Sequence, residues 1–318
     1  MRTLYVDRKN AVLEHDSGAL LVRIPGERPA RVPLAGLERV VVRGSASVAT
    51  GLLSALHEHD VGLLVLSGRL SEPTATLLGR PHVDVVVKIA QLELVRDPTA
   101  RLAYARRLLD AKLQGQLRLL DELRDARPDR RRPLEAARGP LLAARGKLAE
   151  ADLAGLLGLE GTAAAAFFRG LAAVLPPSLG FAGRSRRPPR DPVNACLSLG
   201  YALATHEAAR QAQLVGLDPM LGFLHAPAPG RPALACDLVE PVRCHVDRLV
   251  WRLFAEGRLR AEHARRTAEG CLLSKAGREI FYTAFESELG ALPRLLRRMA
   301  AALVRELRAR PLAEWLAC

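Results

Sequence analysis

The hydrophobic pattern of the N-terminal part of the chain predicts β-strands. Short apolar or β-branched runs alternate there with turn residues such as Asp-Ser-Gly and Pro-Gly, and this alternation is typical of strands joined by tight turns. One run is continuously apolar, which suits a strand buried on both faces. The predicted strands are residues 4–6, 19–24, 39–43, 61–66 and 74–78.

One helix is predicted within this series of strands. Ser47 can cap its first turn, and Val48, Leu52, Leu53 and Leu56 recur at the spacing of one helical face. No titratable group in this N-terminal part of the chain has partners at a spacing that suggests chemistry. We therefore expect a β-rich domain without a catalytic role.

From about residue 88 the apolar positions recur at helical spacing instead. The leucines up to residue 123 allow one or two long helices, which Asp97-Pro98 is expected to interrupt. The basic, Pro-containing residues 127–133 predict a mobile loop between helices. Further helices are predicted at residues 141–154, after Glu160, from Asp191 or Pro192, at 217–224, from Asp237 and Glu240, and at 292–316.

These patterns predict an α+β protein with two domains. A small β-rich N-terminal domain, residues 1–87, is followed by a larger all-α domain, residues 88–318. A chain of 318 residues has room for two domains and a full core. An apolar content of 49% excludes a disordered chain, and because aromatic residues make up only 4%, Leu, Val and Ala must fill the core.

The charge balance favours a polyanionic partner. Lys and Arg number 47 against 34 Asp and Glu, which gives a formal net charge of +13. Most of the basic residues are Arg, whose guanidinium can bind phosphate oxygens through two parallel hydrogen bonds. A general enrichment in Arg is the alternative explanation, so the inference rests on the excess of bases over acids.

The cysteines and the N-terminus favour a cytoplasmic protein. The five cysteines form no Cys-x-x-Cys pair, which argues against a zinc site or a disulfide framework. The N-terminus begins with a strand-like Thr-Leu-Tyr-Val, and no stretch is apolar enough to be interpreted as spanning a bilayer. We therefore expect no signal peptide and no membrane association.

The most informative stretch for chemistry is residues 222–243. His225 ends a short apolar run, and after a loop rich in Pro and Gly, Asp237 and Glu240 stand three residues apart. An imidazole and carboxylates brought together by a turn have the composition of a divalent-metal site. Asp-x-x-Glu before an apolar run is also a helix-capping arrangement, and these residues alone favour the cap.

A basic loop at residues 180–192 predicts contacts with nucleic acid. Arg184, Arg186, Arg187 and Arg190 have no acidic neighbour before Asp191. A loop of this composition is expected to project its cations, and DNA phosphate is their natural counter-charge. A solvated loop is the alternative, and the two interpretations are compatible.

Three motifs together resemble the CRISPR adaptation integrase family, the catalytic subunit that inserts new spacers into CRISPR arrays. Each motif is weak alone, but their order and spacing match the family across the C-terminal two thirds of the chain. The motifs are Leu157-Gly-Leu-Glu160-Gly161, then Asp191-Pro-Val-Asn194-Ala-Cys-Leu-Ser198-Leu-Gly-Tyr201, and finally Gly222-Phe-Leu-His225 with Gly230-Arg231 and Asp237-Leu-Val-Glu240-Pro-Val-Arg243.

This resemblance implies a metal-dependent DNA integrase and endonuclease. Glu160, His225 and Glu240 are the expected ligands of Mg²⁺ or Mn²⁺, with Asp237 among or beside them as a further catalytic residue. A DNA 3′-hydroxyl would attack a phosphodiester at the edge of a repeat. Some relatives have Asp where this chain has Glu240, which lengthens the side chain without removing a ligand.

The resemblance also implies partners. The substrates would be double-stranded DNA, both the prespacer and the CRISPR repeat, with Arg231 and Arg243 joining the loop arginines as DNA contacts. The N-terminal domain would form a homodimer, and a small second adaptation protein would join two dimers into a heterohexamer.

Two other functions stay open from the residues. One is a basic scaffold that binds DNA or RNA without catalysis, and the other is a general metal-dependent nuclease or resolvase. Chemistry on a branched DNA substrate separates them, because a scaffold gives no reaction and a simple nuclease cuts without joining strands.

Overall fold

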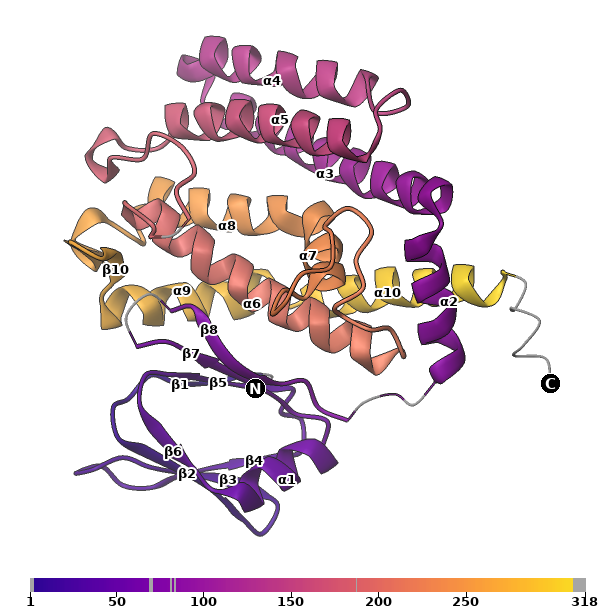
Figure 1. Ribbon diagram of the computed structural model, residues 1–318. Coiled ribbons are helices and arrows are strands. Elements are labelled where there is room, and N and C mark those ends of the chain that lie inside the picture. Colours follow the sequence, from indigo (N-terminus) through magenta and orange to yellow (C-terminus); the bar gives the residue numbers. More distant parts are fainter. Residues whose placement is uncertain (1–2, 69–70, 81, 83, 187, 311–318) are drawn as a thin grey trace, which may run out of the picture. The chain divides into compact units, whose positions relative to one another are not determined.

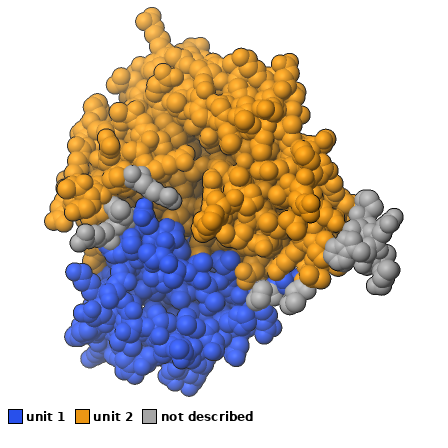
Figure 2. Space-filling view, viewed as in Figure 1, with its two compact units in different colours: residues 1–83 blue, residues 84–318 orange. Residues whose placement is uncertain are grey.

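The computed structural model describes residues 3–310 except 69–70, 81, 83 and 187. The chain divides into two compact units, Met1–Val83 and Asp84–Cys318, shown in different colours in Figure 2. The division lies four residues before the boundary predicted from the sequence. The first unit is β-rich and the second mainly helical, as the α+β prediction requires.

Two four-stranded sheets and one helix form the first unit. One sheet has the order β1-β5-β7-β8 and the other the order β4-β3-β2-β6. The two strands at the centre of the first sheet pair in parallel, and β2 pairs antiparallel with β3 through a tight turn. The bounds are β1 Thr3–Val6, β2 Ala11–Asp16, β3 Ala19–Arg23, β4 Ala30–Pro33, β5 Arg39–Arg43, β6 Ala46–Val48, α1 Thr50–Glu58, β7 Gly62–Leu66 and β8 Pro73–Leu77.

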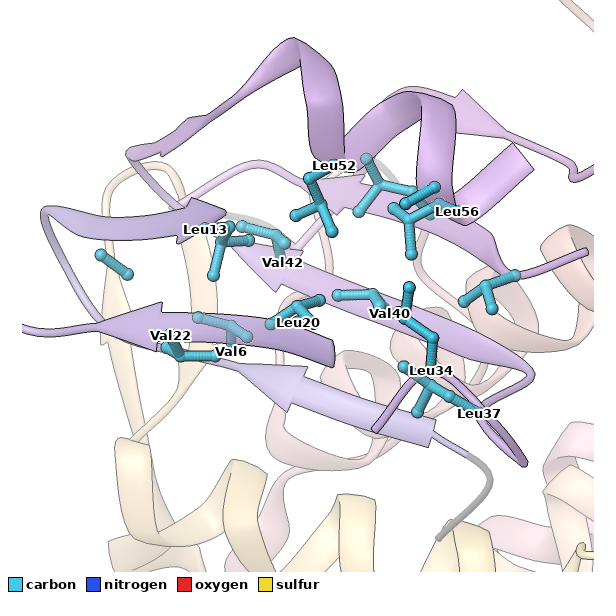
Figure 3. Packing of buried hydrophobic residues seen from close by; sticks show 14 residues of the cluster. Val6, Leu13, Leu20, Val22, Leu34, Leu37, Val40, Val42, Leu52 and Leu56 are labelled. Carbon is cyan, nitrogen blue, oxygen red and sulfur yellow. The ribbon is translucent and has the colours of Figure 1, made fainter. Parts of the chain in front are cut away.

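Aliphatic side chains from both sheets and from α1 fill the core of this unit, as Figure 3 shows. Leu13 lies near Val42 and Leu20 near Val40 of the other sheet, and Leu52 and Leu56 come from α1; all six are almost fully buried. The described members of this cluster are all aliphatic, which agrees with the low aromatic content of the sequence.

A tight turn joins β2 and β3 into a hairpin. Ser17 and Gly18 both have positive φ angles, 46° and 75°, as the central residues of a type I′ turn require. The twist of such a turn matches that of the paired strands.

Three strands of this unit were not predicted from the sequence, and the predicted start of its helix was wrong. The missed strands are β2, β4 and β6. The helix begins at Thr50 after Ala49, and Ser47 lies in β6, where it is paired with Val12 of β2. Backbone pairing between segments distant in sequence therefore overrides the capping preference of Ser47.

The second unit consists mainly of helices. The bounds are α2 Val85–Arg96, α3 Pro98–Ala126, α4 Arg131–Gly146, α5 Leu153–Val174, α6 Pro192–Leu214, α7 Ala233–Val239, α8 Arg243–Ala255, α9 Lys275–Glu288 and α10 Leu292–Arg308. Short 3₁₀ turns are η1 Pro128–Arg130, η2 Pro177–Leu179, η3 Glu240–Val242 and η4 Ala261–His263, and a hairpin joins β9 Ala264–Thr267 to β10 Gly270–Leu273.

Two groups of helices build this unit. The helices α3, α4 and α5 pack on one another, as Figure 1 shows, and α6 packs against α7, α8 and α10. Gly200 permits close packing of α6 on α8, because a Cβ atom at this position would lie 2.5 Å from Cγ1 of Val246. Gly115 does the same for α3, where a Cβ atom would lie 2.8 Å from Sγ of Cys244.

Capping residues account for one predicted helix interruption and one predicted helix start. Asp97 accepts hydrogen bonds from the backbone N–H groups of Thr99 and Ala100 and begins α3 at Pro98. Asp191 accepts one from Asn194 and begins α6 at Pro192. Both sites combine an acidic N-cap with proline at the first helical position, which has no N–H to satisfy.

Other local predictions for this unit were wrong. Residues 127–133 are not a mobile loop, because Arg127 pairs with Asp129 at 2.8 Å and α4 already begins at Arg131. The predicted helix 141–154 is instead the end of α4, a turn and the start of α5. Residues 217–224 form turns rather than a helix.

The prediction that no stretch is apolar enough to span a membrane also needs correction. By length and composition α5 reaches that threshold, with a mean hydropathy of 1.2. However, Ala163, Phe167 and Leu171 of α5 are buried, and the helix packs on α3 and α4. The core helix of a globular protein has the same composition, so its burial accounts for its apolar character.

Candidate active site

Three separate segments of the second unit bring the expected metal ligands together. Glu160 lies within α5, His225 lies in the irregular segment before α7, and Glu240 begins η3. Their side chains are 20%, 18% and 3% exposed. Glu160 was expected in a first helical turn, but α5 begins at Leu153, about two turns earlier.

Pro241 lies in the 3₁₀ turn that carries Glu240. Asp237 and Glu240 were predicted to open one long helix, but Asp237 lies in α7, Glu240 begins η3, and α8 starts at Arg243. Since Pro241 has no backbone N–H to donate, a 3₁₀ turn separates the two α-helices.

Asp237 organises the segment around His225. Its Oδ2 atom accepts hydrogen bonds from the backbone N–H groups of Phe223 (2.5 Å) and Leu224 (3.0 Å). Its Oδ1 atom accepts one from the backbone N–H of His225 (3.0 Å) and contacts the Nδ1 atom of the same histidine at 2.7 Å. Asp237 is fully buried, and both of its oxygens are engaged by the polypeptide.

This contact sets the tautomer of His225. A carboxylate only accepts hydrogen bonds, so Nδ1 carries the proton and the neutral ring presents a lone pair at Nε2. The Nε2 atom lies 4.0 Å from Oε1 of Glu240. The free nitrogen of His225 therefore faces the second expected ligand.

Lys112 of α3 joins the other two expected ligands. Its ammonium contacts Oε1 of Glu160 and lies 2.6 Å from Oε2 of Glu240. The Lys112 side chain is only 4% exposed. Within the described part of the chain, no three His, Cys, Asp or Glu side chains lie close enough to hold an ion directly, and an ammonium stands between these two carboxylates.

Glu240 is held as an anion by two cations. Burial alone would raise its pKa, but the charges of Arg243 and Lys112 outweigh burial and lower the pKa to about 2. Arg243 donates to Oε1. The Lys112 ammonium lies 2.6 Å from the buried Oε2 atom, which is ion-pair distance.

A buried tyrosine and aspartate lie beside this site. The Tyr201 hydroxyl donates to Oδ1 of Asp247, and the Arg243 guanidinium lies 4.3 Å from the centre of the Tyr201 ring. Burial raises the pKa of Asp247 to about 6, although the hydrogen bond from Tyr201 and the charge of Arg243 act against the increase. Among the described residues, Oδ2 of Asp247 has no hydrogen-bond partner.

The structure corrects the expectation that every arginine of loop 180–192 projects into solvent. Arg184 donates to Oδ1 of Asn194 at 2.8 Å and to Oγ of Ser198 at 3.0 Å. Its guanidinium also lies 5.4 Å from the Tyr201 ring centre, and burial lowers its pKa. Arg184 therefore anchors the loop to α6.

The other arginines expected to contact DNA fall into three groups. Arg186, Arg190 and Arg231 are exposed, while Arg243 is turned inward toward Glu240. Arg187 lies outside the described residues.

The types of donor atom, rather than their present spacing among the described residues, suit a hard divalent cation. Glu160 and Glu240 offer carboxylate oxygens, and His225 offers a nitrogen that Asp237 orients from behind. Oε2 of Glu240 is buried and lies 2.6 Å from the Lys112 ammonium, so a cation already lies beside this oxygen. Oxygen donors suit Mg²⁺ and Mn²⁺, and an added imidazole is compatible with Mn²⁺.

His225, Asp237 and Glu240, which were proposed from the sequence, lie near one another in the structure. Lys112 was not proposed, although one signal was present. Lys112 follows Leu108 by four residues and Leu109 by three, which places a cation on the apolar face of a helix. A long charged side chain in that position predicts a buried ion pair. The sequence does not specify its partner.

Known proteins similar to this chain agree with the motifs. The family model for CRISPR associated protein Cas1 matches residues 4–287. A CRISPR-associated endonuclease Cas1 of Thermodesulfovibrio yellowstonii is 34% identical over 90% of this chain and 91% of its own length.

Solved structures show the same fold. A casposase bound to its integration product is 24% identical, with a TM-score of 0.85 over 96% of this chain and 91% of its own. A Cas6–RT–Cas1 chain in complex with Cas2 is 21% identical, with a TM-score of 0.82 over 96% of this chain and 35% of its own. By its motifs and by the extent of these matches, the chain belongs to the CRISPR-associated protein Cas1 family.

Proposed function

We propose that this chain, a DNA endonuclease and integrase of the Cas1 family, inserts new spacers into CRISPR arrays by metal-assisted transesterification. The observation that carries the mechanism is the convergence of Glu160, His225 and Glu240 from separate segments. In the proposed reaction, a DNA 3′-hydroxyl attacks a phosphodiester at the edge of a repeat. One P–O bond forms as another breaks, so the number of phosphodiesters is unchanged.

Glu160, His225 and Glu240 would hold one Mg²⁺ or Mn²⁺ ion. When bound, the ion would stabilise negative charge on the phosphoryl oxygens and help to orient the attacking oxygen. Asp237 would act as a positioning residue, because its oxygens hold the backbone before α7 and the His225 ring. Arg243 would keep Glu240 ionised and in place.

Double-stranded DNA, as prespacer and as repeat, is the proposed substrate. The net charge of +13 and the exposed Arg186, Arg190 and Arg231 support contacts with phosphates. The structure of a related Cas1 chain with Cas2 supports a small second adaptation protein as partner. We extend this to two homodimers, each formed through the first unit, that Cas2 joins into a heterohexamer in the cytoplasm.

An integration assay on branched and linear DNA tests this proposal. Glu160→Gln, His225→Ala and Glu240→Gln should each abolish strand joining in Mg²⁺ and in Mn²⁺ while DNA binding persists. Glu150→Gln is a matched control, because Glu150 is exposed and lies in the turn before α5. If wild-type protein cut DNA without joining strands, it would be a general nuclease, and if it did neither, it would be a scaffold.

A further inference from the structure

Among the residues that the structure describes, Lys112 is the only buried lysine, and it stands between two carboxylates that we assign to the metal. The other lysines, Lys9, Lys88, Lys147 and Lys275, are exposed or half-buried. The Lys112 ammonium contacts Oε1 of Glu160 and lies 2.6 Å from Oε2 of Glu240. These two oxygens come from α5 and η3, so one cation links three separate segments.

Electrostatics explains why a cation is needed at this point. Glu240 is 3% exposed and ionised, and the Glu160 carboxylate contacts the same ammonium. Arg243 pairs with Glu240, but one guanidinium does not offset two carboxylates, and leaving buried charge uncompensated is strongly destabilising. A lysine ammonium is a compact charge with three donors and can serve two carboxylates at once.

A divalent ion that used these same two oxygens would compete with the ammonium for them, because both cations would have to lie within bonding distance of the same atoms. We propose that Lys112 is the built-in counter-ion of the metal-free site, and that binding of the divalent ion is an exchange in which the ammonium leaves Glu160 and Glu240. This inference rests on the proposed function, since it takes Glu160 and Glu240 as ligands.

Asp247 offers a place for the displaced charge. Its Oδ1 atom already accepts a hydrogen bond from Tyr201, but its buried Oδ2 atom has no hydrogen-bond partner among the described residues. The charge of Lys112 already acts on Asp247. Moving the ammonium toward Oδ2 would keep both the displaced lysine and the buried aspartate compensated.

The exchange has two consequences for the protein. The ammonium keeps the carboxylates of α5 and η3 together before any ion arrives. It also weakens the apparent metal affinity, because each ion must displace an internal competitor that is tethered to α3.

Direct measurement of Mn²⁺ binding tests the exchange without relying on activity. Titration of the full-length protein, with free Mn²⁺ followed by electron paramagnetic resonance, gives the affinity. Lys112→Met removes the charge and keeps most of the length, so Mn²⁺ should bind about tenfold tighter or more, as expected when a buried competing ion pair is removed. Lys147→Met, at an exposed lysine in the turn after α4, should leave the affinity unchanged. Equal or weaker binding by a folded Lys112→Met protein would overturn the proposal.

A second measurement uses the wild-type protein in case Lys112→Met does not fold. In protein labelled with ¹⁵N-lysine, the buried Lys112 ammonium should give a distinct side-chain signal, which Lys112→Arg should remove. Saturation with Mg²⁺ should shift or broaden that signal and leave the other lysines unaffected. An unchanged signal when calorimetry shows that Mg²⁺ is bound would overturn the exchange.

One further variant separates this inference from the proposed function. Glu240→Gln should lose most Mn²⁺ binding. If it binds Mn²⁺ as tightly as wild type, the ligand set itself is wrong, and the exchange fails with it. If Glu240→Gln loses Mn²⁺ binding but Lys112→Met does not gain it, the metal site stands and only the exchange fails.

Discussion

Asp237 holds His225 at two points, because its Oδ1 atom accepts from the backbone N–H of the histidine at 3.0 Å and contacts its ring Nδ1 at 2.7 Å. The other carboxylate oxygen binds the backbone of the two preceding residues. The position and the tautomer of the histidine thus depend on one buried carboxylate.

Replacing the Asp237 carboxylate should lower both the stability of the protein and its affinity for the metal. Asp237→Asn keeps the shape but turns one acceptor into a donor facing backbone N–H groups. Unsatisfied buried donors should lower the free energy of unfolding by about 1–3 kcal/mol. Mn²⁺ affinity should fall by about 10–100-fold through misorientation of His225. Chemical denaturation and Mn²⁺ titration measure both, with Asp125→Asn, at a side chain that is 77% exposed near the end of α3, as control. Unchanged metal affinity would show that Asp237 does not position the histidine.

Asp247 should make the free energy of unfolding decrease as pH rises, which is the opposite of what a carboxyl with a lowered pKa does. Burial raises its pKa from 3.8 to about 6, so the folded state binds a proton more tightly than the unfolded state. That contribution is fully present below the unfolded pKa and is lost as pH rises through about 6. Between about pH 4 and pH 7, wild type should therefore lose about 2–3 kcal/mol of unfolding free energy relative to Asp247→Asn. Denaturation of the two proteins across this range provides the comparison, and parallel curves would contradict the shift.

The basic loop should divide into DNA-binding and anchoring arginines. Arg186→Ala with Arg190→Ala should weaken binding to unrelated DNA sequences about equally. The slope of log affinity against log salt should flatten by about 0.9 for each phosphate that no longer meets an arginine. Arg145→Ala is the control, because Arg145 is already paired with Asp110 at 2.6 Å. An unchanged slope in the double variant would mean that the loop is solvated and does not touch DNA.

Arg184→Ala should behave differently from that double variant. Its guanidinium donates hydrogen bonds to Asn194 and Ser198 of α6. Its removal should therefore lower the melting temperature and reduce integration, while the slope of log DNA affinity against log salt changes little. Thermal unfolding and salt titration of the same protein distinguish the roles. A normal melting temperature with a flattened slope would return Arg184 to the phosphate-binding group.

The first unit should carry the dimer contact. A fragment that begins at Asp84, the first residue of the second unit, should sediment as a monomer, whereas the full chain should sediment as a dimer. Analytical ultracentrifugation over a range of concentrations tests this expectation. A dimeric fragment would place the contact in the helical unit.

The sequence predicted the elements whose signals are local. Asp97 and Asp191 each precede a proline; the helical stretch is interrupted at Asp97, and a helix begins at Pro192, as expected. The proximity of His225, Asp237 and Glu240 could be expected because their motif lies in one short stretch. Motif spacing, however, did not reveal that Asp237 binds three successive backbone N–H groups, because that depends on the path of an irregular segment.

Long-range partners could not be predicted in the same way. Lys112 meets Glu160 and Glu240 only after α3, α5 and η3 have packed, and no local pattern encodes that meeting. Arg184 was expected in solvent because its neighbours are basic, but Asn194 and Ser198 offered it partners on another element. In both cases tertiary contacts override the preference of the local sequence.

Gly115 gives the position of Lys112 a steric origin. The glycine lies three residues after Lys112, on a neighbouring part of the same helical face, and its missing side chain lets α3 approach Cys244 at the start of α8. The residues just before α8 are those of η3, which carries Glu240. A methyl group at position 115 would act as a spacer between the two segments and draw the ammonium away from its carboxylate. The charge balance of the site is therefore set in part by the thickness of an uncharged residue one helical turn away.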